Sequence, residues 1–311
     1  MTSIIGRNFH NILIVVVWGV LFLITGCGQA RQQVTPRGVL SANEINTFAS
    51  DFDSLLKKYW EVCAKHDLKQ VRTLYTEDIK VIDAGDTVME GSMYVSGVFC
   101  STFYMVYPGF EGRSVANYID RDGGVYIEDT WGWSLRSEIP IATFSENRPM
   151  TTYMWFTTRD GLIARVWMLY GEEVFAELDE TPFPGAILKD YSTAWSSNRP
   201  QKIAELYSSD AVYRDSLFRD NIQGVKAIEE FASKYFAWYP DIRVKLVKSF
   251  GHYPSASHIG GLFTMDVLDR NGGDCSIQKL IFLHIDPTTQ KILEEWVFYQ
   301  PDLLLACGWA Q

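Results

Sequence analysis

The sequence predicts an α+β protein with two tandem domains, each placing helices first and an antiparallel sheet after them. The ten residues LYTEDIKVID (Leu74 to Asp83) return as LYSSDAVYRD (Leu206 to Asp215), an offset of 206 − 74 = 132 positions. Around each copy, apolar residues recur first at helical spacing and then in alternation. Between the copies, ETPFPGA contains two prolines and a glycine, as expected of a domain boundary. One fold present twice explains this order.

In the first half, apolar residues at threes and fours from about Ser41 to Cys63 predict one buried helix face. A second short helix follows and turns into the strand IKVID. A third helix starts after Gly91 and ends at Tyr107 and Pro108. Alternating strands follow, and the half closes on the aromatic strand IARVWMLYG.

The second half repeats this order. Its first helix carries Tyr191 and Trp195 on one face, and a second short helix leads to the strand AVYRD. A third helix starts after Gly224 and ends at Tyr239 and Pro240. IRVKLVKSF then alternates apolar and charged residues, which indicates a sheet with one solvated face. The last strand is ILEEWVFYQ.

The N-terminus is separate from this fold. Arg7 precedes an apolar run from Ile12 to Ile24, a length typical of a signal peptide and short for a membrane span. The run ends in ITGC, which resembles the bacterial lipobox. We therefore expect a signal peptide over 1–26, a lipidated Cys27 and a tether over 27–40, so that the protein is exported and anchored at a bacterial membrane surface. The alternative is an uncleaved anchor helix.

Composition excludes several kinds of partner and cofactor. The chain has 311 residues and a formal net charge of −10, and it shows no basic patch, so nucleic acid is not an expected partner. No glycine-rich nucleotide motif is present, and no cofactor is expected. No metal site is expected either, because the histidines that follow the expected signal peptide lack metal-binding spacing. These histidines are His66, His252, His258 and His284.

Four cysteines follow Cys27, and their pairing is open because four cysteines allow three connectivities. Cys63 and Cys100 lie among apolar residues and are interpreted as buried free thiols. The other two are Cys275 and Cys307.

The repeated LY words ending in Asp, the turn glycine and the late Tyr-Pro resemble the SnoaL-like, nuclear-transport-factor-like superfamily, which includes ketosteroid isomerase. The resemblance covers about 41–177 and 184–301 and gives domains over 41–180 and 187–311, joined by a linker over 181–186. It implies cone-shaped domains, each with three helices on a curved antiparallel sheet around a cavity. It also implies a sheet-to-sheet pseudo-dimer within the chain.

The same resemblance implies site residues. Asp215 and Asp83 fall where ketosteroid isomerases keep their general base, and Tyr191 and Tyr59 fall where they keep a hydrogen-bond donor. The family's second donor is an acid on the penultimate strand. The corresponding positions are Tyr153 in the first half and about Lys279 in the second, so the family's pattern is incomplete here.

The residues themselves favour a similar position for Asp215. Alternate residues of a strand share a face, so Tyr213 and Asp215 point the same way. In an aromatic-lined cavity, a carboxyl group loses hydration and its pKa rises, which makes it a usable base. In the alternative interpretation, Asp215 accepts backbone N–H groups or pairs with Arg214 or Arg219.

The last strand offers a second acid, because Glu295 shares a face with Val297 and Tyr299. Glu295 either forms a carboxylate pair with Asp215 in the cavity or is the cross-strand partner of Lys279. The expected ligand-lining residues are Trp195, Tyr213, Glu295, Tyr299, Tyr153 and Tyr170. Large apolar residues on the opposite face predict the contact between the domains. These residues are Trp167, Leu169, Trp296 and Phe298.

Three functions remain open from the sequence. The first is a module that binds a small apolar or amphipathic molecule at the membrane surface. The second is an enzyme of isomerase, cyclase or hydratase type, with Asp215 as general base and Tyr191 as hydrogen-bond donor. The third is a scaffold whose cavities are filled by their own aromatic side chains.

Overall fold

The structure is a computed structural model that describes residues 39–65, 67–83, 87–97, 111–120, 123–131, 150–171, 185–251, 257–268 and 273–302. The predicted signal peptide, Cys27 and most of the tether lie outside these residues. So do Cys100, Cys307 and the end of the third helix predicted for the first half. Within the described residues, no helix has both the length and the apolar character needed to cross a membrane.

The N-terminal half, which we define as Ser41–Gly171, begins with a helix whose start is capped. Ser41 and Glu44 bond reciprocally to each other's backbone N–H groups, a capping box that stabilises the first turn. The elements that follow confirm the predicted order of helices before strands. They are α1 (Ala42–Ala64), α2 (Leu68–Arg72), β1 (Tyr75–Asp83), β2 (Thr87–Glu90), α3 (Ser92–Val95), β3 (Glu111–Asp120), β4 (Gly123–Trp131), β5 (Met150–Arg159) and β6 (Leu162–Gly171).

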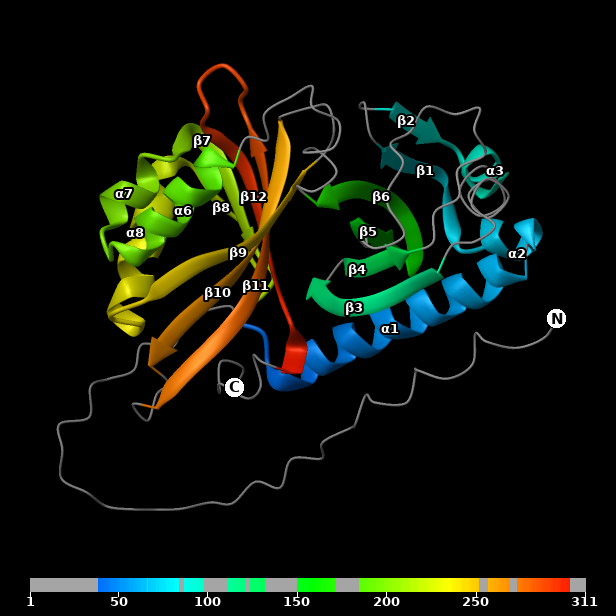
Figure 1. Ribbon diagram of the computed structural model, residues 1–311, viewed down its shortest axis with the longest axis horizontal. Helices are drawn as coiled ribbons and strands as arrows, with labels where there is room; N and C mark the ends of the chain where they lie inside the picture. The colour runs from blue at the N-terminus through cyan, green and yellow to red at the C-terminus, as the bar shows by residue number, and fades with distance from the viewer. Residues whose placement is uncertain are drawn as a thin grey trace, which may run out of the picture. The chain divides into compact units, whose positions relative to one another are not determined.

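The C-terminal half, Gly185–Tyr299, has a similar order of elements. Figure 1 shows α6, α7 and α8 grouped together, and α6 contacts β9. The elements are α6 (Ala186–Ser196), α7 (Pro200–Ala204), β7 (Tyr207–Asp215), β8 (Ile222–Gln223), α8 (Val225–Trp238), β9 (Arg243–Gly251), β10 (His258–Leu268), β11 (Asp274–Ile285) and β12 (Ile292–Tyr299).

Both halves contribute to one twelve-stranded sheet, of which eight strands close into a ring in the order β11-β10-β9-β6-β5-β4-β3-β12. The halves meet where Tyr170 and Gly171 of β6 pair with β9, and where Tyr299 of β12 pairs with Ile119 of β3. Pairing of β11 with β12 closes the ring. The sheet is therefore continuous from one half to the other.

Two strand pairings depart from the predicted all-antiparallel sheet. β1 pairs with β6 in parallel, and β7 pairs with β12 in parallel. Each pair joins the first and last strands of its half. A parallel pair needs a long crossover connection, and here the rest of the half supplies it. Spacing within one strand does not reveal its direction relative to a distant partner, which is why the sequence did not show these pairs.

The buried side chains form two clusters. The larger one lies between the helices and the sheet and contains both Tyr59 and Tyr191. The smaller, which we call the ring cluster, takes residues from all eight strands of the ring, so it fills the ring's interior. Its members are Tyr118, Val125, Tyr153, Trp155, Leu169, Phe250, Leu280, Phe282 and Phe298, with Trp167, Leu262 and Trp296 packed against them.

Candidate functional site

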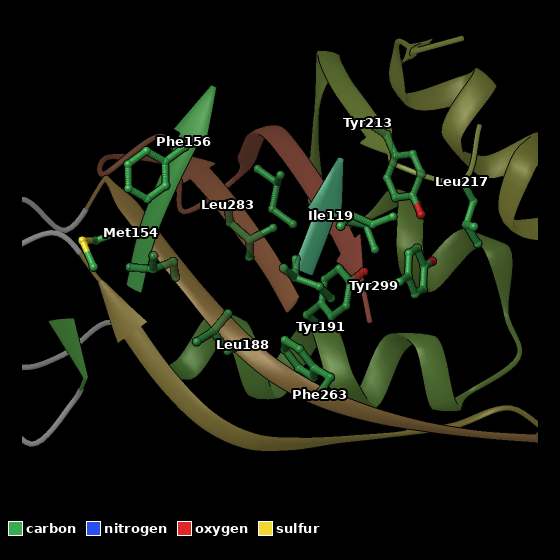
Figure 2. Close-up of a cluster of buried hydrophobic side chains, with 14 of the residues drawn as sticks. Ile119, Met154, Phe156, Leu188, Tyr191, Tyr213, Leu217, Phe263, Leu283 and Tyr299 are labelled. Atoms are coloured by element: carbon green, nitrogen blue, oxygen red, sulfur yellow. The ribbon is translucent and has the colours of Figure 1, made fainter. Parts of the chain in front are cut away.

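The C-terminal half brings together most of the polar residues predicted to lie in its cavity. In α6, Tyr191 and Trp195 are four residues apart and so share the buried face of the helix. β7 contributes Tyr213 and Asp215, and β12 contributes Glu295 and Tyr299. Figure 2 shows Tyr191, Tyr213 and Tyr299 in one cluster with Phe263 and Leu217. The strand alternation predicted for these residues is confirmed.

Asp215 is 4% exposed, and both of its carboxylate oxygens accept hydrogen bonds. Tyr213 Oη and Tyr299 Oη donate to Oδ2 at 2.9 and 3.0 Å, and the backbone N–H of Leu217 donates to Oδ1 at 2.9 Å. Burial raises the pKa of Asp215, while these bonds and the charge of Lys279 act in the opposite direction. Asp215 is thus both a buried acid and the acceptor for a turn.

Glu295 is 0% exposed and lies between two tyrosines. Tyr191 Oη donates to Oε1 at 2.7 Å, and Tyr207 Oη donates to Oε2. Burial raises the pKa of Glu295 to about 7, against the opposing effect of both hydrogen bonds and of Lys279. A carboxyl group with a pKa in this range can take up and release a proton near neutral pH.

Lys279 completes the group from β11 and is 2% exposed. Its Nζ lies 5.0 Å from the centre of the Trp195 ring and 5.5 Å from that of Tyr191, both within cation–π range. Burial lowers the pKa of Lys279 to about 8, although the charges of Glu295 and Asp215 act to raise it. Three ionisable side chains, which we call the buried triad (Asp215, Glu295 and Lys279), therefore share one enclosed region.

The strand register does not place Glu295 opposite Lys279, as one of the two predictions required. Lys279 is opposite Tyr299, and Glu295 is opposite Leu283. The two acids do not share a hydrogen bond either, because each accepts from its own pair of tyrosines. Asp215 and Glu295 interact through their charges, since Asp215 raises the pKa of Glu295.

The alternative interpretation of Asp215 is half correct. The backbone contact with Leu217 is present. The two neighbouring arginines instead pair with other acids, Arg214 with Glu294 at 3.4 Å and Arg219 with Glu44.

The region around the buried triad is filled with aromatic rings. Trp195 packs edge-on against Tyr235 and Phe236, and Tyr191 lies 5.4 Å from Phe263. All of these side chains are buried. Two surface hollows lie elsewhere, one along Arg72, Glu90 and Met93 and the other along Gln201, Lys226 and Glu230. A ligand that reaches the triad must therefore displace or rearrange packed side chains.

The N-terminal half has a simpler arrangement. Tyr59 is buried, and Tyr75 Oη donates to Tyr59 Oη at 3.2 Å. Around Tyr59 lie the rings of Trp60 and Phe156. The backbone of Asp83 ends β1 opposite Thr87, and its side chain lies outside the described residues. Its predicted role stays a prediction.

Tyr153 lies on the opposite face of the sheet from the one predicted. It stacks on Phe250 in the ring cluster, with ring centres 3.9 Å apart. The strand register explains the difference. Lys279 is opposite Tyr299, and the residue opposite the equivalent Tyr170 is Thr152, so Thr152 and not Tyr153 corresponds to Lys279. The predicted correspondence was therefore displaced by one residue, which reverses the face of a strand. Tyr170 does pack against the larger cluster, which lies between the helices and the sheet.

The four residues predicted to join the domains all belong to or pack against the ring cluster. Leu169 and Phe298 are buried members, and Trp167 and Trp296 pack against them. Rings from different halves touch there, such as Trp155 and Phe298 with centres 5.5 Å apart.

Cys63 and Cys275 are both disulfide-bonded. The prediction of a free thiol is therefore wrong for Cys63. An apolar neighbourhood did not exclude a bonded partner, since disulfides are themselves often buried. Among the described residues, no group of three or more His, Cys, Asp or Glu is arranged to hold a metal ion.

Tyr207 is a site residue that sequence reasoning missed. The predicted strand AVYRD began only at Ala211, whereas β7 begins at Tyr207, whose hydroxyl donates to Glu295. The repeated LY word contained the signal, because Tyr75 of the first copy also reaches the tyrosine of its own first helix.

No protein-family model matches the sequence, and no curated protein matches it. Solved structures match part of it. A protein from Catenulispora acidiphila DSM 44928 with a ketosteroid-isomerase-like fold, solved with trimethylamine, is 17% identical over 42% of this chain and 95% of its own, with a TM-score of 0.36.

A SnoaL-like polyketide cyclase, described as putative, from Shewanella denitrificans OS-217 is 14% identical over 42% of this chain and 99% of its own, with a TM-score of 0.36. PrhC from Penicillium brasilianum NBRC 6234 is 9% identical over 39% of this chain and 83% of its own, also with a TM-score of 0.36. The chain is thus similar over about two fifths of its length to proteins of the fold that its sequence resembles.

Proposed function

We propose that the chain is an exported, lipid-anchored protein of two tandem SnoaL-like domains, of which the second binds a small molecule with an apolar body and a polar group. The observation that carries this proposal is the buried triad enclosed by tyrosine and tryptophan rings. Burying three ionisable groups is costly, and apolar residues would pack the same space more stably. Proteins retain such groups where function uses them.

Matching strand arrangements support the tandem organisation. In each half the first strand pairs with a short strand in antiparallel orientation and with the last strand in parallel. The ring cluster, with Trp167, Leu169, Trp296 and Phe298, serves in this proposal as the contact between the two domains of an internal pseudo-dimer.

The N-terminal sequence supports export and anchoring, and the bonded state of Cys63 and Cys275 suits an oxidising compartment. We expect Cys27→Ser to abolish incorporation of labelled palmitate in a bacterial host, because the thiol carries the lipid. Gly28→Ala should keep the label. Palmitate retained by the Cys27→Ser protein would contradict the anchoring proposal.

A second candidate function is proton-transfer catalysis, of isomerase, cyclase or hydratase type. The pKa of Glu295 near 7 favours it. In this version Glu295 takes the acid–base role predicted for Asp215, since the hydroxyl of Tyr191, the predicted hydrogen-bond donor, donates to Glu295. Asp215 then holds Tyr213 and Tyr299 in place.

The binding proposal is tested with the full chain by Glu295→Gln, with Glu294→Gln as matched control. Glu294 is the adjacent residue, faces the other side of the strand and pairs with Arg214. We expect Glu295→Gln to unfold at higher denaturant and to lose a small molecule that wild type and Glu294→Gln retain in native mass spectrometry. A destabilised Glu295→Gln protein, together with a wild type that retains nothing, would contradict the proposal.

A further inference from the structure

Lys279 has a buried amino group whose hydrogen-bonding capacity is unused. Its Nζ contacts two ring faces, but within the part of the chain that the structure describes it has no hydrogen-bond acceptor and no carboxylate at ion-pairing distance. The charges of Glu295 and Asp215 act on it only from farther away. Buried ammonium groups are normally paired, so an amine left in this way requires an explanation.

Trp195 provides a second unused donor at the same place. Its ring is the one 5.0 Å from Lys279 Nζ, its side chain is 1% exposed, and its Nε1 is buried without a hydrogen-bond partner in the described structure. Two neighbouring donors, one on α6 and one on β11, thus lack an acceptor. A ligand with an acceptor oxygen would satisfy either of them.

The charge of the surroundings restricts what that oxygen belongs to. The buried triad contains two acids and one base, so an anionic ligand would be repelled by each ionised acid in an enclosed, low-dielectric region. A neutral acceptor avoids this repulsion. A carbonyl oxygen is the simplest neutral group that accepts two hydrogen bonds and has no proton of its own to donate.

We propose that Lys279 is a carbonyl-reactive amine, which condenses reversibly with a small aldehyde or ketone bound beside the rings of Tyr191 and Trp195. The lone pair of neutral Nζ forms a bond to the carbonyl carbon, the carbonyl oxygen takes a proton and becomes a hydroxyl, and the nitrogen loses one of its protons. The hydroxyl takes a second proton and leaves as water, and loss of the remaining N–H proton gives the imine. Two protons thus pass from nitrogen to oxygen with Glu295 as the acid–base group in this proposal, and no oxidant or reductant is needed. The proposal rests on the binding function proposed above.

The environment of Lys279 supports this chemistry, because an amine must be neutral to attack a carbonyl. Burial lowers its pKa to about 8, so at pH 7 roughly one amine in ten is neutral, against about one in 2,500 for an ordinary lysine. The rings of Tyr191 and Trp195 also keep water from the bond that forms. The titratable groups that act on Lys279 are Glu295 and Asp215, and these two acids interact in turn with Tyr191, Tyr207, Tyr213, Tyr235 and Tyr299.

The test is reductive trapping on the full-length wild-type protein, with propanal as probe and cyanoborohydride to reduce the imine. Peptide mass spectrometry measures the rate at which Lys279 is alkylated. In the same sample it measures the rate for the exposed Lys202, which is paired with Glu205. At pH 7 we expect Lys279 to react at least about tenfold faster, despite its burial, because of its neutral fraction. Its rate should level off above about pH 8.

Trp195→Phe keeps the ring and removes the N–H group, so in a folded variant the trapping of Lys279 should fall severalfold while that of Lys202 stays the same. Trapping of Lys279 more slowly than Lys202 in wild type, or equal trapping in folded Trp195→Phe, would overturn the proposal. If Lys279 is not trapped but Glu295→Gln still gains stability and loses a retained molecule, only the amine chemistry fails. If the Glu295→Gln test fails as well, the binding function fails with it.

Discussion

The two halves of the chain build the same junction of helix, first strand and last strand from different side chains. Strand register allows the halves to be compared residue by residue. Val81 of β1 is opposite Val166 of β6, and Tyr213 of β7 is opposite Glu295 of β12, so Val166 corresponds to Glu295. By the same reasoning Thr152 corresponds to Lys279. The tyrosine pair is present in both halves, as Tyr59 with Tyr75 and as Tyr191 with Tyr207.

The difference shows that the fold does not require the charges. The N-terminal half closes the junction with Val166, which is fully buried, and its two tyrosine hydroxyls contact each other. The C-terminal half inserts a carboxyl group between the tyrosines and adds an amine across the sheet. The buried triad is therefore an addition to a junction that packs without it, which is the reason to look for function in the C-terminal half.

The largest effect is expected when an acid is placed in the N-terminal half at Val166, the position that corresponds to Glu295. We expect Val166→Glu to lose about 3–5 kcal/mol of unfolding free energy at pH 7.5, since the position corresponding to Lys279 is a threonine and cannot supply the cation that acts on Glu295. Urea unfolding measures it. Val166→Gln, with the same shape and no charge, should lose clearly less. Equal losses would mean that volume, and not charge, separates the halves.

The pH dependence of stability isolates the acid of the C-terminal half. The pKa of Glu295 is about 7 in the folded protein against an ordinary 4.5, so the folded state holds this proton more tightly. The resulting stability is fully present below pH 4.5 and is lost as pH rises through 7. A shift of this size is worth roughly 3 kcal/mol. Wild type should therefore lose about that much more than Glu295→Gln between pH 4.5 and 7.5, and parallel curves would contradict the assignment.

Removal of one hydroxyl from each half compares the tyrosine pairs directly. Tyr191→Phe takes a donor from a buried carboxyl group and should lose about 2 kcal/mol at pH 7.5. Tyr59→Phe breaks a contact between two neutral hydroxyls and should lose about 1 kcal/mol. Denaturant unfolding of the two variants gives the difference. A larger loss for Tyr59→Phe would reverse the comparison.

The smallest effect is expected for Asp215→Asn. Burial raises the pKa of Asp215, so removing its charge favours the folded state, while the Asn oxygen can still accept from Leu217. We expect a gain in unfolding free energy of under about 1 kcal/mol, less than that of Glu295→Gln. If Asp215→Asn instead lowers the unfolding free energy by more than about 1 kcal/mol, Asp215 is a structural acid. Glu295 is then the only functional acid of the two.

Much of the site was predictable from local pattern. The shared faces of Tyr213 with Asp215, and of Glu295 with Tyr299, follow from strand alternation, and Tyr191 and Trp195 follow from helical spacing. The position of Tyr153 was not predictable in this way, because it depends on which residue lies opposite Tyr170 across two strands. The contact of Tyr207 with Glu295 likewise depends on a parallel pairing between strands far apart in the chain.

The sequence by itself determined the order of helices and strands, the repeated word and the set of side chains available to each face, because these properties depend on neighbours within one turn or one strand. The tertiary structure alone decided that β1 and β7 run parallel to the last strand of their half, and that eight strands close into a ring around aromatic side chains. It also decided that Glu295, and not Asp215, accepts the hydrogen bond that the hydroxyl of Tyr191 donates. Those features depend on register between distant segments, which is set by the packing of whole faces against one another.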